Sequence, residues 1–195
     1  MQTLPRFIKT SGLKRTQIFK KIKEARSISL VKKVNHNYSL NETLWAKAFT
    51  FFEELNKYNE TIDERVPVNS MIYYKTSGEI IFSNIEKIDA TLTAFSAYEK
   101  YGIKILSGKS YYHLPKRKLT RKEVFKHSLI IAKKTHNLQD LIIVTLFFAK
   151  YKNELLSVKD ELLVDIKKVL KGESLLGYPT LAEIKDRAEV YDITI

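Results

Sequence analysis

The spacing of apolar residues over the first 25 positions predicts two short helices joined by a tight turn. Residues 3–10 carry apolar side chains at helical spacing, and Gly12 interrupts this pattern where a left-handed turn residue is needed. Residues 13–25 then resume the helical period, with Ile18 and Ile22 on the side that would face inward. Two helices joined by a glycine turn are typical of a helix-turn-helix.

The pattern then changes from a helical to an alternating period. Residues 27–33 alternate apolar or β-branched with polar side chains, residues 35–37 are turn formers, and residues 38–40 return as a short strand. A hairpin directly after a basic helix is the wing of a winged helix, and a wing commonly lies on the phosphate backbone. We therefore predict an N-terminal winged helix-turn-helix.

A longer amphipathic helix is predicted next, followed by a boundary. Residues 42–58 present a broad apolar face that would either pack on the preceding elements or form a dimer seam, and we favour packing. Residues 59–68 are polar and acidic and include a proline, which indicates a linker. The predicted domains are 1–58, a winged helix-turn-helix with its following packing helix, and 69–195.

The remaining chain is predicted to be a mixed α+β domain with a buried central helix. Residues 138–151 are apolar nearly all round, which is typical of a helix buried at the centre of a domain. The other expected elements are hairpins over 71–83 and 103–115, the second turning at Ser107-Gly108, and helices over 88–102, 119–135, 159–171 and 181–191. Gly102 would end the first of these helices, and Thr120 and Glu123 stand at capping-box spacing at the start of the second.

Charge is concentrated in two segments of the 195-residue chain. The formal net charge is +12; residues 1–40 carry net +9 and residues 116–134 carry net +7, while the rest is slightly acidic. Clustered positive charge is expected of a protein that binds a polyanion such as nucleic acid. A solvated lysine-rich surface is the alternative.

The predicted recognition helix and wing supply the candidate DNA contacts. Arg15 and Gln17 are suited to base edges, since arginine pairs with guanine and glutamine with adenine. Lysines would bind phosphates and contribute affinity and salt dependence. The candidate DNA-binding residues are Lys14, Arg15, Thr16, Gln17, Lys20, Lys21, Lys32, Lys33, His36 and Asn37.

The second basic segment allows two interpretations. It would extend the phosphate contacts to a neighbouring DNA or RNA segment, or it would be an exposed entry to the helix over 119–135, which we favour. Positive charge in the first turn of a helix opposes the helix dipole, which hints at a use for the charge. The residues are Lys116, Arg117, Lys118, Arg121 and Lys122.

Two stretches resemble known families. SGLKRTQIFKKIKEARSISLVKKVNHNYSLN resembles the winged helix of prokaryotic transcription regulators, with Gly12-Leu13 at the turn and Ile18 and Ile22 at two buried positions of the recognition helix. ATLTAFSAYEKYGIKILSGKSYYHLPKRKLTRKEVFKHSL resembles the C-terminal domain of AbiEi-like antitoxins and transcription regulators. The resemblance implies a DNA-binding repressor, and some members pair with a nucleotidyltransferase toxin.

Enzyme chemistry is not indicated by any complete motif. The chain has no cysteine, and its six glycines form neither a Walker A motif nor a GxGxxG motif. A metal-dependent nuclease or transferase would have to bring Asp89, Glu99 and Asp140 together, which their spacing does not require. His127 lies within an apolar helix and is interpreted as a hydrogen-bonded core histidine. We predict no catalytic residue, no metal site and no cofactor.

These observations together favour a DNA-binding transcriptional regulator, an autorepressing antitoxin being one form of it. The expected partners are double-stranded DNA and a second copy of the chain, because one winged helix reads only a few base pairs; a toxin is a further partner. An RNA-binding or protein-interaction module that reuses the winged helix is the alternative. The longest apolar run is too short to span a membrane, so we expect a soluble, cytoplasmic protein.

Overall fold

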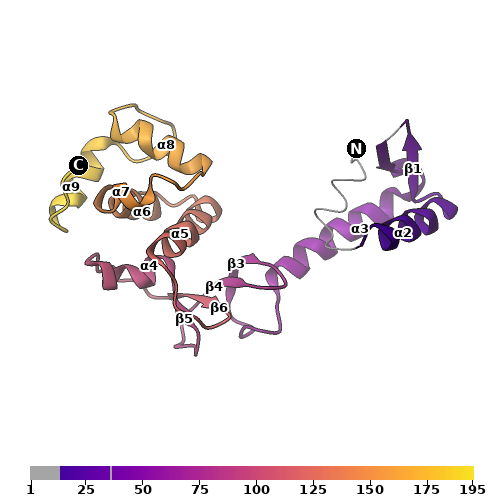
Figure 1. The fold of residues 1–195 in the computed structure, drawn as a ribbon, viewed down its shortest axis with the longest axis horizontal. Coiled ribbons are helices and arrows are strands. Elements are labelled where there is room, and N and C mark those ends of the chain that lie inside the picture. Colours follow the sequence, from indigo (N-terminus) through magenta and orange to yellow (C-terminus); the bar gives the residue numbers. More distant parts are fainter. Residues whose placement is uncertain (1–13, 36) are drawn as a thin grey trace. The chain divides into compact units, whose positions relative to one another are not determined.

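The chain is a mixed α+β protein, as predicted, and it divides into two compact units (Figure 1). The structure is a computed structural model that describes residues 14–35 and 37–195. The boundary between unit 1 and unit 2 falls between Asn59 and Glu60. The helix predicted over 3–10, the Ser11-Gly12 turn and His36 lie outside the described residues.

Unit 1 contains a helix followed directly by a two-stranded antiparallel sheet. Helix α2 spans Arg15–Ser27, and strands β1 (Val31–Val34) and β2 (Asn37–Leu40) pair with Val31 opposite Leu40. Asn35 has a φ of 56° at the start of the turn, a left-handed conformation that asparagine tolerates better than most residues. The predicted helix and hairpin are therefore present.

Helix α3 (Glu42–Thr61) is largely exposed among the described residues. Trp45 is non-helical (φ −118°, ψ 25°) and half-buried, but no side chain of α3 is buried within the described structure. Phe51 and Tyr58 are 62% and 60% exposed. Ile18 is the one buried residue of α2 within the described structure. The favoured interpretation, that this helix packs on the winged helix, stays a prediction.

Unit 2 is built on a four-stranded antiparallel sheet with the strand order β3-β4-β6-β5. Its strands are β3 (Met71–Lys75), β4 (Ile80–Asn84), β5 (Thr91–Leu92) and β6 (Ser110–Leu114). Every residue of β4 is buried, because apolar side chains cover both faces of the sheet at this strand. Strand β4 is thus covered on both faces, whereas Met71 and Tyr74 of the edge strand β3 are exposed.

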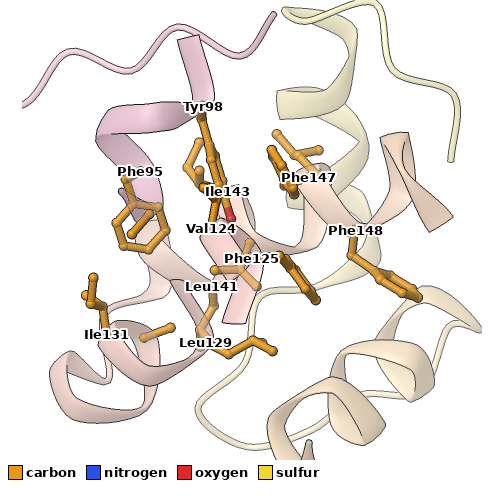
Figure 2. Close-up of a cluster of buried hydrophobic side chains, with 14 of the residues drawn as sticks. Phe95, Tyr98, Val124, Phe125, Leu129, Ile131, Leu141, Ile143, Phe147 and Phe148 are labelled. Atoms are coloured by element: carbon orange, nitrogen blue, oxygen red, sulfur yellow. The ribbon is translucent and has the colours of Figure 1, made fainter. Parts of the chain in front are cut away.

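Helices cover one face of this sheet and enclose the main core. They are α4 (Ala94–Ala97), the 3-10 helix η1 (Tyr98–Tyr101), α5 (Arg121–Thr135), α6 (Leu138–Lys150), α7 (Lys152–Leu155), α8 (Glu161–Leu170) and α9 (Leu181–Glu189). In α6, residues 141–148 are all buried, so the prediction of a buried central helix is confirmed. Figure 2 shows Phe147 and Phe148 of this helix among aromatic and aliphatic side chains from α4, η1 and α5.

Two predicted elements of unit 2 were wrong in extent. The helix predicted over 88–102 begins only at Ala94, because Thr91 and Leu92 pair with β6 as strand β5. The hairpin predicted over 103–115 lacks its first strand within the described residues, since β6 pairs with β4 and β5 instead. Gly102 does end the helical segment, with a φ of 72°.

The predicted linker over 59–68 is tied to the β3–β4 turn. Helix α3 continues to Thr61, and Arg65 donates hydrogen bonds to the carbonyl oxygens of Thr76 (2.9 Å) and Ser77 (3.3 Å). Asp63 orients this guanidinium by accepting hydrogen bonds from its Nε and Nη2, both at 2.8 Å. From Ile62 onward the segment therefore belongs to the structured part of unit 2.

Replacing this carboxylate is expected to weaken unit 2 in a pH-dependent way. The hydrogen bond from Arg65 lowers the pKa of the Asp63 carboxyl below its usual range. Its stabilising contribution is present above the unfolded-state pKa of about 3.9 and is lost as the pH falls through the lower folded-state pKa. Asp63→Asn should cost about 1–2 kcal/mol near neutral pH, and its deficit relative to wild type should shrink in acid.

Urea denaturation at neutral pH and near pH 3 would measure this difference. Asp186→Asn, at an exposed position of α9, is the matched control and should behave as wild type at both values. A deficit for Asp63→Asn that is the same at both pH values would contradict the assignment.

Candidate functional site

The candidate nucleic-acid surface lies on the exposed side of α2. This helix carries five basic residues and one acidic residue. Because Ile18 is buried, helical geometry places Thr16, Lys20 and Lys23 on the side that faces away from the protein. The predicted residues of this segment are all exposed: Lys14, Arg15, Thr16, Gln17, Lys20 and Lys21.

The side chains of this surface differ in how far they are already engaged. Gln17 Oε1 accepts a hydrogen bond from the backbone N–H of Lys14 (3.0 Å), which caps the start of α2. The Lys21 ammonium lies 3.2 Å from a carboxylate oxygen of Glu24. Lys20 has no ion-pair partner among the described residues, and neither has Lys23. Lys23 was not among the predicted contacts, although its spacing from Lys20 places it on the same side of the helix.

The guanidinium of Arg15 is held near a ring of the same helix. Its Cζ lies 5.6 Å from the ring centroid of Phe19, which is itself 43% exposed. A cation over an aromatic face is attracted by the ring quadrupole, so this contact restricts the orientations that the guanidinium samples. Arg15 is therefore partly preorganised on an exposed surface.

The two lysines of the hairpin lie within strand β1 and not at the tip of the turn. Lys32 lies opposite Ser39 and Lys33 opposite Tyr38, and both lysines are exposed. Successive strand residues point to opposite faces, so the two lysines do not share one face of the hairpin. Asn37 is half-buried in the pair next to the turn. His36 was predicted at the tip and lies outside the described residues.

The second basic segment is committed to neighbours within unit 2. Lys118 is exposed and has no ion-pair partner among the described residues, whereas the other four bind side chains nearby. The pairs are Lys116 with Asp89, Arg117 with Glu123 (2.7 Å), Arg121 with Glu154, and Lys122 with Ser157 (2.8 Å). This pattern favours the interpretation of a helix entry over that of a phosphate-binding surface.

The start of α5 explains part of this arrangement. Thr120 caps the helix and accepts a hydrogen bond from the Glu123 N–H, while the Glu123 carboxylate returns to the Thr120 N–H, which is the predicted capping box. The hydrogen bond from the Arg117 guanidinium lowers the pKa of Glu123 to about 2, and the hydrogen bond from the Thr120 N–H acts in the same direction. The positive charge here therefore offsets a carboxylate that the helix uses as a cap.

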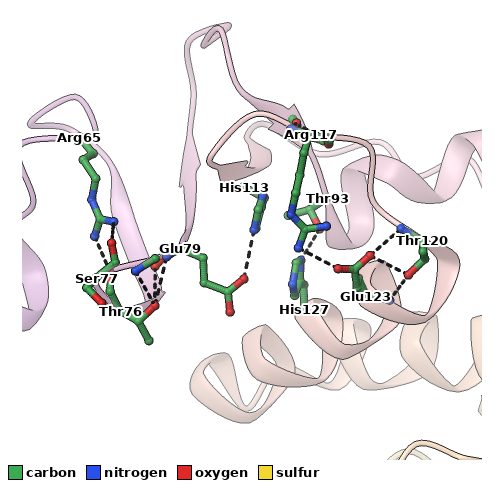
Figure 3. Close-up of polar contacts among 12 residues, drawn as sticks. Arg65, Thr76, Ser77, Glu79, Thr93, His113, Arg117, Thr120, Glu123 and His127 are labelled. Carbon is green, nitrogen blue, oxygen red and sulfur yellow. Dashed lines mark hydrogen bonds and ion pairs between the residues drawn. The ribbon is translucent and has the colours of Figure 1, made fainter. Parts of the chain in front are cut away.

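A second cluster of polar groups lies between the sheet and α5 (Figure 3). Glu79 precedes β4, His113 lies in β6, and His127 lies in α5. The Glu79 Oε2 is 3.2 Å from the His113 Nε2, and the two imidazole rings stack with centroids 5.2 Å apart at 9°. The Thr93 hydroxyl lies 2.7 Å from the His127 Nδ1.

Both histidines are removed from solvent. His113 is fully buried and His127 is 5% exposed. Burial is the main cause that lowers the pKa of His127 to about 4, and the neighbouring His113 lowers it further. This ring is therefore neutral near neutral pH. His127 was predicted to be a hydrogen-bonded core histidine, and its contact with Thr93 is consistent with that interpretation.

The cluster itself was missed from the sequence. We predicted no metal-ligating group, because no two histidines stand four residues apart and no carboxylate near a histidine was taken as a ligand; Glu123 does stand four residues before His127. The three residues meet through the pairing of β4 with β6, which sets Ile80 opposite Leu114, and through the packing of α5 on the sheet. A correct prediction that β4 pairs with β6 would have indicated that Glu79 and His113 lie close together.

The three carboxylates considered for a nuclease each contact a different partner. Asp89 pairs with Lys116, Glu99 lies 3.8 Å from Lys104, and Asp140 accepts a hydrogen bond from Thr135. They form no common metal-ligand group within the part of the chain that the structure describes. Nothing in their geometry supports the nuclease alternative.

Comparison with protein-family models, with curated proteins and with solved structures found no match to this chain. None of the helices in the described residues combines the length and the apolar character needed to cross a membrane.

Proposed function

We propose that this protein is a DNA-binding transcriptional regulator that reads duplex DNA with α2 and the β1–β2 hairpin, arranged as a winged helix-turn-helix. The observation that carries this proposal is the contrast between the two basic segments. Lys20 and Lys23 face solvent without an ion-pair partner in the described structure, whereas the cations of 116–122 are largely engaged. Unengaged lysines on one helix face are what phosphate binding requires.

Some side chains of α2 would contribute affinity for DNA, and others would contribute sequence specificity. Lys20, Lys23 and a wing lysine would contact phosphates, because an ammonium is a compact charge with no base preference. Arg15 is the stronger candidate for a base edge, since its guanidinium is held by Phe19 and pairs bidentately with guanine. Gln17 would have to release its capping contact before it could pair bidentately with adenine.

Helix α3 supports a second copy of the chain as the partner on DNA. Ala48, Phe51, Leu55 and Tyr58 alternate at spacings of three and four residues, which is the period of a coiled-coil seam. Phe51, Leu55 and Tyr58 are 62%, 39% and 60% exposed. A two-fold dimer would cover this face and match a two-fold DNA site. A nucleotidyltransferase toxin as a further partner rests on the sequence resemblance alone.

Duplex binding measured by fluorescence anisotropy across a salt series tests the proposal. Wild type should bind a mixed-sequence duplex with a steep dependence on salt. Lys20→Glu/Lys23→Glu removes two phosphate contacts, so the affinity at about 0.1 M salt should fall roughly 10- to 100-fold and the logarithmic salt slope should fall by about 2.

The matched control places the same charge change in unit 2. Lys118→Glu/Lys126→Glu alters two exposed lysines and should leave the affinity and the slope close to those of wild type. Equal losses in both double variants would mean that net charge alone drives binding. No binding by wild type at about 50 mM salt would refute the regulator, and a clear preference for structured RNA would favour the RNA-binding alternative.

A further inference from the structure

We propose that Glu79, His113 and His127 form a binding site in unit 2 for a divalent transition-metal ion, with Zn²⁺ as the best fit. One ligand atom from each of these side chains lies within 4.8 Å of the other two. The site draws on three separate segments of the fold and lies in a different unit from the proposed DNA surface. It therefore stands or falls independently of the proposed function.

The two imidazoles are held on regular elements before any ion arrives, and binding a shared ion requires one of the nearly parallel rings to turn. His113 lies on β6, where it pairs with Ile81 of β4, and His127 lies on α5. The rings are buried and stacked, and the Thr93 hydroxyl contacts Nδ1 of His127, which leaves its Nε2 for an ion. Metal-bound histidines usually have such a hydrogen bond at the other ring nitrogen, since it fixes the ring orientation.

The donor set and its dimensions suit zinc. Two imidazole nitrogens and one carboxylate oxygen are the ligands of many zinc sites that keep a fourth position for water. Zinc–ligand distances of about 2.0–2.1 Å place tetrahedral ligand atoms roughly 3.3 Å apart. The His113 Nε2 and Glu79 Oε2 already lie 3.2 Å apart, so most of the adjustment falls on the approach of His127.

The surroundings open one side of the cluster to solvent and limit the repulsion that an ion would meet. The Glu79 side chain is 35% exposed, so the carboxylate side of the cluster is open to solvent and a fourth, water position is available there. Arg117 lies near His127, but its charge is offset by Glu123 at 2.7 Å. The carboxylate of Glu79 supplies the negative charge that the ion requires.

One contact that strong sites have is missing. The Nδ1 of His113 is buried and has no hydrogen-bond partner among the described residues. When its Nε2 binds an ion, the proton must lie on this nitrogen, where no acceptor receives it. Incomplete outer contacts typically lower metal affinity 10- to 100-fold. We therefore expect weaker binding than in a structural zinc site.

Calorimetric titration of chelator-treated full-length protein with Zn²⁺ tests the site. Wild type should bind one ion at this cluster and should unfold at a higher temperature when it is bound. Glu79→Gln changes a partly exposed side chain and should weaken binding at least tenfold without unfolding the protein, and His127→Gln should do the same. Titration with Co²⁺ should give visible absorption bands of low-symmetry coordination, which Glu79→Gln weakens.

Two control variants keep the test specific. His136→Asn alters an exposed histidine whose φ of 48° asparagine tolerates, and Glu86→Gln alters an exposed carboxylate. Both should bind Zn²⁺ as wild type does. The proposal is overturned if wild type binds no Zn²⁺, or if Glu79→Gln and His127→Gln bind it as tightly as wild type.

Discussion

Phe147→Ala is expected to lower the free energy of unfolding of unit 2 by about 4 kcal/mol. Phe147 is fully buried in α6, and its ring stacks on Tyr98 with centroids 3.9 Å apart at 16°. Tyr101 and Tyr151 contact the same ring with centroids 5.5 Å and 5.1 Å away. Truncation removes the transfer free energy of the ring and leaves a cavity whose aromatic walls cannot collapse readily.

Urea denaturation followed by the near-ultraviolet circular dichroism of the tyrosines would measure this loss, because these side chains surround the site. Phe52→Ala is the matched control: Phe52 is 47% exposed on α3, so its truncation should cost well under 1 kcal/mol. A loss below about 1 kcal/mol for Phe147→Ala would show that this aromatic cluster is not the packed centre of unit 2.

Phe51→Glu/Leu55→Glu is expected to convert the proposed α3 dimer into a monomer. Both side chains lie in the three-four repeat of α3, and a charge at the centre of an apolar seam is left without a partner when the seam closes. In the proposed dimer, loss of the second copy would remove the advantage of binding two half-sites together. Affinity for a duplex with two half-sites should therefore fall roughly 10²- to 10⁴-fold, while affinity for a single half-site stays close to that of wild type.

Sedimentation equilibrium and anisotropy with one-site and two-site duplexes would separate these effects. Ala46→Glu/Thr50→Glu places the same two charges on the opposite side of α3 and should remain dimeric. If wild type sediments as a monomer, or if both double variants remain dimeric, α3 is not the seam.

Elements with complete local signals were predicted well. The helix over 119–135 was found because Thr120 and Glu123 stand at capping-box spacing ahead of a periodic apolar run, and the structure forms that box. The buried helix over 138–151 was found because its composition leaves no polar face. Each of these signals lies within a few residues of the element that it defines, so a single sequence is sufficient to read it.

The errors come from interactions between distant residues. β6 pairs with β4 and with β5, and both pairings are set by the sheet and not by the turn-like Ser107-Gly108. The same pairings bring Glu79 to His113, which no spacing along the chain reveals. The exposed positions of α2 followed from helical periodicity, but the partners of Arg117 and Arg121 required the fold.

Trp45 gives the two units separate optical signals. It is the single tryptophan of the chain and lies at the non-helical position of α3, half-buried within unit 1. Tryptophan-selective fluorescence therefore reports on unit 1, while most tyrosine signal arises from unit 2. Denaturation curves from the two probes that coincide would mean one cooperative transition, and curves with separate midpoints would mean that each unit unfolds by itself in the intact chain.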